Sequence, residues 1–234
     1  MIAIITYDAP HRKTQDLICK LILNGYPEIH LVVIPWIQRK NYQPIFSHRP
    51  SGKVPVSIEE TCARMHLDFT RVNTEDLTHY FDQNSFDHIL IGGAGILPED
   101  LAANHKVINA HPGYLPNTKG LDAFKWSIYS GMPIGATTHY ISDKTDEGEL
   151  IEKKIIPVYF EDTFHSVAYR LYETEIDMMV NAIRRIEQNE ATLESLADDS
   201  YISNRRMPHH LELVMMHRFE SLRINSPSIK SIPK

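Results

Sequence analysis

Two groups of polar residues in the middle of the chain have the types and spacing needed for chemistry at a carbonyl carbon. Asn109 and His111 are separated by one residue, and Asp146 stands in a second cluster that ends at Gly148. The apolar pair 107–108 precedes the first group and predicts a buried strand with Asn109 and His111 at its carboxyl end. Because side chains at i and i+2 of a strand point to the same side, Asn109 and His111 can face one spot.

These three residue types fit acyl transfer directly to an amine. A tetrahedral, negatively charged intermediate needs hydrogen-bond donors at its oxygen, and the Asn109 amide and a protonated His111 imidazole can supply them. The attacking amine must lose a proton, for which an imidazole that titrates near neutral pH is suited. Asp146 would orient His111 and favour its charged form. No Cys or Ser nucleophile is evident, so the pattern indicates a reaction without a covalent enzyme intermediate.

The elements around these residues alternate between strand-like and helix-like stretches. Continuous apolar runs predict buried strands, and apolar residues at helical spacing predict helices between them; the helix after Ser57 opens with a capping box completed by Glu60. The expected strands are 2–6, 29–36, 67–72, 87–92 and 150–158, and the expected helices are 14–24, 57–66, 74–83 and 164–190. This order predicts an α/β fold with a Rossmann-like, doubly wound and mostly parallel sheet, and ligands at the carboxyl ends of its strands.

The chain reads as one catalytic domain, 1–196, followed by a short and partly helical C-terminal extension, 197–234. Within the extension, the polar Ser226 to Lys234 predicts a disordered or flexible tail. A long Pro-containing and Gly-containing stretch, 38–55, predicts an irregular loop, and such loops are often functional.

Composition narrows the function classes. A net charge of −6 gives no reason to expect a nucleic-acid partner. Two cysteines are too few for a disulfide framework or a thiolate metal site. The N-terminal apolar run is too short for a signal peptide, and no run approaches the ~18 apolar residues of a membrane span. We therefore expect a cytoplasmic protein with no membrane partner.

The central stretch resembles the signature of the folate-dependent formyltransferases. The residues that carry the resemblance are Asn109-Ala-His111-Pro-Gly113, Pro116, Gly120, Gly135-Ala-Thr-Thr-His139 and Asp146-Glu-Gly148. The family includes glycinamide ribonucleotide and methionyl-tRNA formyltransferases, and the resemblance covers about 86–158. It implies that Asn109, His111 and Asp146 are catalytic and that 10-formyltetrahydrofolate is the formyl donor. It also implies that two loops contact the pterin, through Gly95, Ile96, Leu97, Ile141, Ser142 and Asp143.

The residues directly after the first strand suggest the acceptor. Glycinamide ribonucleotide enzymes usually carry a Gly/Ser-rich phosphate loop there, whereas this chain has TYDAPHRK, which lacks glycine. Methionyl-tRNA enzymes carry a sizeable basic C-terminal domain, which this chain is too short and too acidic to contain. The sequence is therefore similar to the sugar N-formyltransferases, and a nucleotide-linked 4-amino-4,6-dideoxyhexose for O-antigen synthesis is the expected acceptor. The residues expected to bind it are Tyr7, Asp8, Arg49, Ala110, Pro112 and Gly113, with the basic HRKT and HRP stretches facing a diphosphate.

Other interpretations remain open. A glycinamide ribonucleotide formyltransferase, a formyltetrahydrofolate hydrolase that passes the formyl group to water, or a non-catalytic nucleotide-sugar binder would share much of the pattern. A nicotinamide-dependent enzyme is disfavoured, because no G-x-G-x-x-G follows the first strand.

The roles of several single residues also remain open. His139 and Asp143 either satisfy each other or face substrate, and Asp8 either lines the cleft or caps a helix. His209, His210 and His217 do not form a plausible metal site, so no metal is expected. The apolar C-terminal helices hint at a homodimer.

Overall fold

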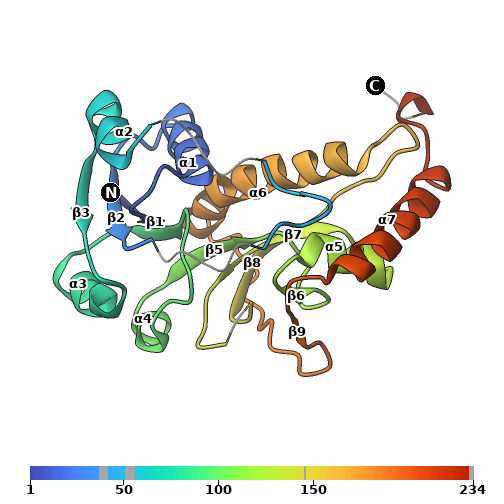
Figure 1. Cartoon of the computed structure of the whole chain (residues 1–234). Helices are drawn as coiled ribbons and strands as arrows, with labels where there is room; N and C mark the ends of the chain where they lie inside the picture. Colours follow the sequence, from blue (N-terminus) through green and yellow to red (C-terminus); the bar gives the residue numbers. More distant parts are fainter. Residues whose placement is uncertain (37–41, 51–55, 145, 232–234) are drawn as a thin grey trace.

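The computed structural model describes residues 1–36, 42–50, 56–144 and 146–231. A mixed sheet lies at its centre with helices on both faces (Figure 1). The strands are β1 (Ile2–Tyr7), β2 (Ile29–Ile34), β3 (Asp68–Arg71), β4 (His88–Ile91), β5 (Val107–His111), β6 (Lys119–Gly120), β7 (Gly135–Tyr140), β8 (Glu149–Ile155) and β9 (Ser203–Asn204). The helices are α1 (Arg12–Leu23), α2 (Ile58–Met65), α3 (Leu77–Gln83), α4 (Glu99–Asn104), α5 (Ala123–Ser130), α6 (Phe164–Glu187) and α7 (His209–Ile224), with 3₁₀ helices at Thr74–Asp76 and Ile229–Ser231.

The seven-stranded sheet has the order β3-β2-β1-β4-β5-β7-β8. The strands from β3 to β5 are parallel, whereas β7 runs antiparallel to β5 and β8 antiparallel to β7. The chain winds outward in both directions from β1 and β4, so the crevice between their carboxyl ends is the switch point at which sheets of this kind bind ligands. The predicted doubly wound, mostly parallel fold is confirmed.

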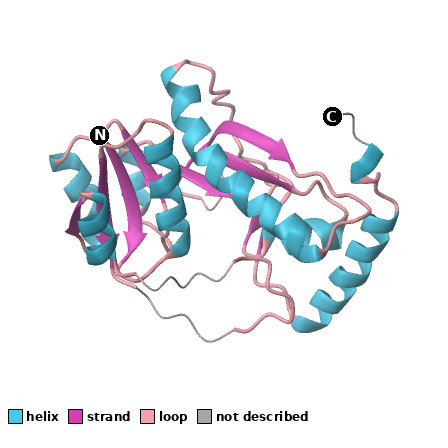
Figure 2. Cartoon of the chain, turned by 90° about the horizontal axis from the view of Figure 1, so that it is seen from above, coloured by secondary structure: helices cyan, strands magenta, loops and turns pink. Residues whose placement is uncertain are grey.

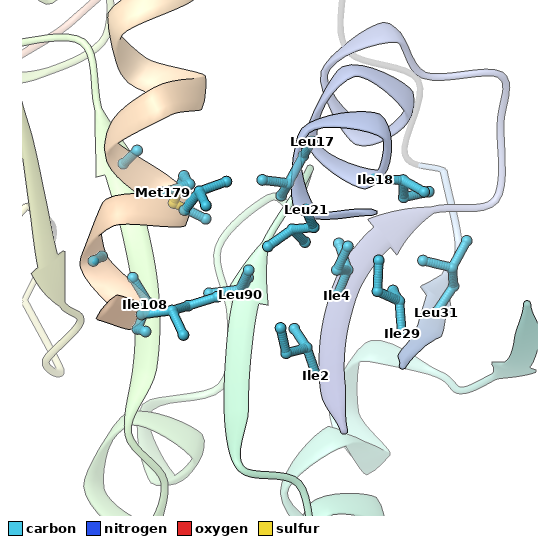
Figure 3. Close-up of a cluster of buried hydrophobic side chains, with 14 of the residues drawn as sticks. Ile2, Ile4, Leu17, Ile18, Leu21, Ile29, Leu31, Leu90, Ile108 and Met179 are labelled. Atoms are coloured by element: carbon cyan, nitrogen blue, oxygen red, sulfur yellow. The ribbon is translucent and has the colours of Figure 1, made fainter. Parts of the chain in front are cut away.

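One face of the sheet is covered by α1, α2 and α6. Leu17 and Leu21 of α1 and Met179 of α6 pack against β-strand residues such as Ile4 and Leu90, all of them almost completely buried (Figure 3). Leu17 and Leu21 are four residues apart, as are Met179 and Ile183 of α6, which places each pair on one face of its helix. The opposite face of the sheet is covered by α3 and α4, through side chains that include Leu77 and Leu101.

A third core joins the C-terminal extension to the rest of the chain. Met207, Met215 and Phe219 pack with Phe124 of α5 and Phe164 of α6. The short strand β9 also pairs with β6, which follows the predicted catalytic residues on β5. Figure 2 shows α7 alongside α5 and the N-terminal end of α6, where Phe219 meets Phe164. The extension therefore shares its core with the part of the chain that carries the site.

Several local expectations need correction. The stretch 135–140 was not expected to be a strand, yet it forms β7, and α4 and α5 were not predicted either. The expected flexible tail contains a 3₁₀ helix at Ile229–Ser231, and the Ile229 N–H donates to the Glu161 carboxylate at 2.9 Å. Residues 232–234 and much of the predicted loop 38–55 lie outside the described residues, so the functional role of that loop stays a prediction.

Candidate active site

A buried ion pair connects the two polar groups that the sequence singles out. His111 Nδ1 lies 3.2 Å from Asp146 Oδ1, and their side chains are 6% and 11% exposed. His111 ends β5, and Asp146 belongs to the loop between β7 and β8. The remaining Asp146 oxygen, Oδ2, accepts the backbone N–H of Gly120 at 2.6 Å. The structure thus brings the predicted His and Asp into direct contact.

The hydrogen bonds of His111 define its charge. Nε2 lies 2.9 Å from the carbonyl oxygen of Thr118, which can only accept, and Nδ1 faces a carboxylate. Both ring nitrogens therefore carry protons, and the ring is an imidazolium. Burial alone would lower the pKa of His111, but the Asp146 charge and hydrogen bond and the Thr118 carbonyl outweigh burial and raise it. Burial would raise the pKa of Asp146, but the His111 charge and the Gly120 N–H lower it to about 2.

This arrangement alters the role that we expected for His111. Both N–H groups are already committed, so in this conformation the ring presents positive charge but no spare donor to a substrate oxygen. A fixed positive charge in a dry site stabilises a developing oxyanion through space. Direct donation to substrate, or proton relay, would require Nε2 to leave Thr118.

The backbone around the pair is shaped to hold it. Asp146 has a φ of +55°, which turns its carboxylate toward Gly120 and His111. A Cβ at Gly113 would lie 2.5 Å from the Thr118 carbonyl oxygen and 2.6 Å from His111 Nε2. Only glycine leaves room there for the ring to reach its carbonyl partner. Thr137 on β7 fixes the same turn, because its hydroxyl donates to the Gly113 carbonyl at 2.8 Å.

Asn109 is oriented by a neutral histidine on the neighbouring strand. Asn109 and His139 are directly opposite each other in the β5–β7 ladder. His139 Nδ1 lies 3.0 Å from the Glu147 carbonyl and 3.1 Å from the Tyr140 carbonyl, so this nitrogen carries the proton. Nε2 can then accept from Asn109 Nδ2 at 3.4 Å. Burial lowers the pKa of His139 to about 4, which keeps the ring neutral at pH 7.

The His139 contacts decide one question that the sequence left open. His139 is 1% exposed, and its ring nitrogens contact backbone carbonyls and Asn109. Asp143, by contrast, is exposed in the loop after β7. The two side chains therefore do not satisfy each other, and His139 acts on Asn109.

A cavity of about 580 Å³ lies between α4 and the loop after β7, near the amino end of β5, and its lining residues do not include Asn109, His111 or Asp146. Three of the residues expected to contact the pterin, Ile141, Ser142 and Asp143, line it, as does Gly148 of the Asp146 cluster. Gly95, Ile96 and Leu97 are not among its lining residues, although their loop leads into α4, which forms the other wall. Ile96 of that loop is 92% exposed, so its side chain contributes to neither the core nor the cavity wall.

A lysine and a buried carboxylate lie beside β5. Lys13 Nζ lies 2.5 Å from Glu175 Oε1 of α6 and 3.5 Å from the Ala110 carbonyl of β5. Burial would raise the pKa of Glu175, but the charges of Lys13 and Arg49 lower it. Burial and the same two cations lower the pKa of His11 to about 4. Lys13 therefore lies against β5, and the charges of Lys13 and Arg49 act on both His11 and Glu175.

Sequence reasoning overlooked Glu175. It is 2% exposed and lies in the apolar stripe of α6, four residues from both Leu171 and Met179. A charged residue in a buried helix stripe is a signal for a paired or functional group, and this signal was available in the sequence.

The other residues expected to bind the acceptor lie in different surroundings, some near the end of β1 and some around β5. Tyr7 lies at the carboxyl end of β1, 5.5 Å from the His11 ring. Asp8 forms a two-pronged ion pair with Arg71 at 2.8 and 3.2 Å and does not cap α1, whose N-cap is His11.

The expected acceptor-binding residues on and after β5 contribute mainly backbone. The Ala110 side chain is buried in the core, so only its backbone faces Lys13. Gly113 packs behind His111, and the neighbouring Pro112 is partly buried.

A second buried ion pair fixes the segment that carries Arg49. Glu212 of α7 and Lys125 of α5 are 2.8 Å apart, and both side chains are 0% exposed. Glu212 also accepts the backbone N–H groups of Ile45 and Phe46 at 2.7 and 3.0 Å. Arg49 stands a few residues later in the same segment, and its charge reaches His11 and Glu175. The C-terminal extension therefore holds the segment that carries Arg49, one of the residues expected to bind the acceptor.

Comparison with known proteins agrees with this geometry. The model of the family described as "Formyl transferase" matches residues 13–183, which is most of the chain and includes Asn109, His111 and Asp146. The chain belongs to this family. A phosphoribosylglycinamide formyltransferase from Bacillus subtilis is 30% identical over 82 residues, which cover 35% of this chain and 42% of that protein.

Solved structures of formyltransferases share the fold. A sugar N-formyltransferase from a Shewanella species superimposes with a TM-score of 0.63 at 17% identity, covering 93% of this chain and 87% of that chain. The formyltransferase PseJ from Anoxybacillus kamchatkensis has a TM-score of 0.52 at 21% identity, with 84% and 82% covered. Among curated relatives, the matched segments span 6–42% of the length of the relative.

Two findings concern other classes of site. Among the described residues, no group of three His, Cys, Asp or Glu side chains is placed to hold a metal ion. In the same part of the chain, no helix is long and apolar enough to cross a membrane.

We expect Glu212→Gln to destabilise the protein strongly. The substitution leaves Lys125 as an uncompensated buried charge and removes one of the two oxygens that accept four hydrogen bonds. Loss of one partner of a buried pair costs about 3–5 kcal/mol, measurable by urea unfolding. The matched control is Glu220→Gln on the same helix, which breaks a partly exposed pair with Arg223 and should cost at most about 1 kcal/mol. Equal losses of unfolding free energy in the two variants would contradict a stabilising role for the Glu212–Lys125 ion pair.

Proposed function

We propose that this protein transfers a formyl group from 10-formyltetrahydrofolate to the amine of a nucleotide-linked amino sugar. The observation that carries the proposal is the buried His111–Asp146 pair, with Asn109 beside it, at the carboxyl end of a central strand. Lys13 lies beside the same strand, at the Ala110 carbonyl, and the loop that carries Asp146 also lines a cavity through Ile141, Ser142 and Asp143. We place the acceptor near Lys13 and the donor at this loop.

The loop between β7 and β8, which carries Asp146, is the proposed contact for the pterin. The cavity of about 580 Å³ is within the range of small-molecule sites. Its walls offer the backbone of Ile141–Asp143 and the carboxylates of Asp100 and Glu149, which can accept from the N–H groups of a pterin ring. The Anoxybacillus formyltransferase was solved in complex with tetrahydrofolate. When bound, the donor would supply an activated formyl carbonyl.

The chain's own residues would supply the environment for the transfer. A bond forms between the acceptor nitrogen and the formyl carbon, the bond from that carbon to the donor nitrogen breaks, and the proton lost by the amine is balanced by one gained at the donor nitrogen. The Asn109 amide, held by His139, would donate to the formyl oxygen. The positive His111 would stabilise the negative charge that develops there, and Asp146 would maintain that charge.

The acceptor side favours a nucleotide sugar. The turn after β1 lacks the glycines of a phosphate loop, and Lys13 and Arg49 supply the cationic groups instead. The complex of the Anoxybacillus formyltransferase also contains a UDP-linked 4-formamido sugar. By analogy, a dTDP-linked 4-amino-4,6-dideoxyglucose is our first candidate acceptor here. Cytoplasmic location, a role in O-antigen synthesis and a homodimer remain predictions.

A second candidate is glycinamide ribonucleotide formylation, because the B. subtilis relative is a phosphoribosylglycinamide formyltransferase. A single phosphate could bind Lys13 and Arg49 equally well. Hydrolysis of the donor is the third candidate, in which water replaces the amine at the same three residues.

The direct test is a product assay. The protein is mixed with 10-formyltetrahydrofolate and, separately, dTDP-4-amino-4,6-dideoxyglucose, glycinamide ribonucleotide or buffer. We expect a mass gain of ~28 Da on the sugar nucleotide, which is one formyl group in place of one hydrogen. A gain only on the ribonucleotide would favour the second candidate, and tetrahydrofolate release in buffer would favour the hydrolase.

Variants test the assigned residues. We expect Asn109→Ala, His111→Ala and Asp146→Ala each to lower kcat/KM by at least ~100-fold, the scale of a lost oxyanion or acid–base group. His217→Ala, at an exposed position on α7, and Asp199→Ala, at an exposed loop position, are the controls and should retain the full rate. Near wild-type rates in His111→Ala or Asp146→Ala would exclude the assignment.

A further inference from the structure

An exposed tryptophan stands at the ligand-binding edge of the sheet. Trp36 follows β2 and is 52% exposed. The Tyr7 ring, at the end of β1, meets it edge-on, with centroids 4.7 Å apart and an interplanar angle of 80°. Tyr7 in turn meets the His11 ring at 5.5 Å. The indole is thus fixed by an aromatic neighbour on one side while much of its surface faces solvent.

The position of Trp36 relative to the reacting residues is defined by the sheet. Moving from β5 through β4 and β1 to β2 takes three steps between neighbouring strands. Strands lie about 4.8 Å apart, so the end of β2 lies about 14 Å from the end of β5. Lys13 lies beside β5 at the Ala110 carbonyl, and His11 lies between Lys13 and Tyr7 in sequence and beside the Tyr7 ring.

The chemical groups along this edge have a definite order. The Asn109, His111 and Asp146 group comes first, the cation Lys13 at the Ala110 carbonyl comes next, and the rings of Tyr7 and Trp36 come last. A nucleotide sugar presents an amine, a hexose, two phosphates, a ribose and a base in the same order. Aromatic side chains bind bases by stacking, whichever base is present.

We propose that Trp36, supported by Tyr7, is the platform on which the nucleobase of the acceptor stacks. This inference rests on the proposed function and deepens it, because it names where the distal end of the nucleotide sugar is bound. It also separates the acceptor candidates. Glycinamide ribonucleotide has a phosphate and a ribose but no base, so Trp36 would contribute nothing to its binding.

The test has two independent readouts. The chain has two tryptophans, and the other, Trp126, donates its Nε1–H to the Arg205 carbonyl. In Trp126→Phe, Trp36 is therefore the only tryptophan that emits. We expect dTDP and UDP to quench this fluorescence and inorganic pyrophosphate not to do so. Absence of quenching at saturating nucleotide would overturn the proposal.

The second readout is kinetic. We expect Trp36→Ala to raise KM for dTDP-4-amino-4,6-dideoxyglucose at least ~10-fold with kcat unchanged, because the base is remote from the reacting atoms. Trp36→Phe should retain most of the affinity, and Trp126→Phe should match the wild type. If the sugar nucleotide is formylated with the same KM by Trp36→Ala, the stacking inference is wrong and the proposed function stands. If no sugar nucleotide is formylated, the proposed function fails, and the quenching experiment still decides whether Trp36 binds a base.

Discussion

The structure depends on keeping a histidine positively charged where water is largely excluded. A charged imidazole and a charged carboxylate in a buried position are costly unless each finds its partners. His111 and Asp146 compensate for this cost with each other, with the Thr118 carbonyl and with the Gly120 N–H. The backbone between β5 and β8 must therefore supply one carbonyl and one amide at defined points. That requirement explains the tight approach at Gly113 and the left-handed conformation of Asp146.

Everything else at the site is arranged around this charge. The neutral His139 orients the amide of Asn109 across the β5–β7 ladder, and the His111–Asp146 pair supplies the charge. Lys13, which follows β1 in the chain, reaches the Ala110 carbonyl between Asn109 and His111. Glu212 extends the site to the C-terminal extension, because it binds the segment that carries Arg49. Two buried ion pairs, His111–Asp146 and Lys125–Glu212, thus hold the candidate catalytic residues and the segment that carries Arg49.

The sequence predicted those features that depend on local pattern. Apolar runs identified the parallel strands, and the predicted proximity of His111 and Asp146 is observed, whereas their catalytic role stays a prediction. Strand β7 was missed because GATTHY has neither a continuous apolar run nor clear alternation, and all six residues are buried by tertiary packing. The commitment of both His111 nitrogens could not be predicted, because Thr118 reaches the ring only through the turn between β5 and β6. Glu212 was missed because its partners lie on α5 and in the 42–46 segment, far apart in sequence.

The most direct test of the central claim is the protonation state of His111, read by NMR of protein with ¹⁵N-labelled histidine and assigned with His111→Gln. We expect both ring nitrogens to be protonated at pH 7, because Nδ1 faces the Asp146 carboxylate and Nε2 faces the Thr118 carbonyl, and both partners can only accept. In Asp146→Asn the pKa should fall and the neutral ring should dominate at pH 7, since burial then acts against the charge with less opposition. Asp143→Asn, at an exposed position in the same loop, should leave His111 charged. A neutral His111 at pH 7 in the unmodified protein would contradict the account.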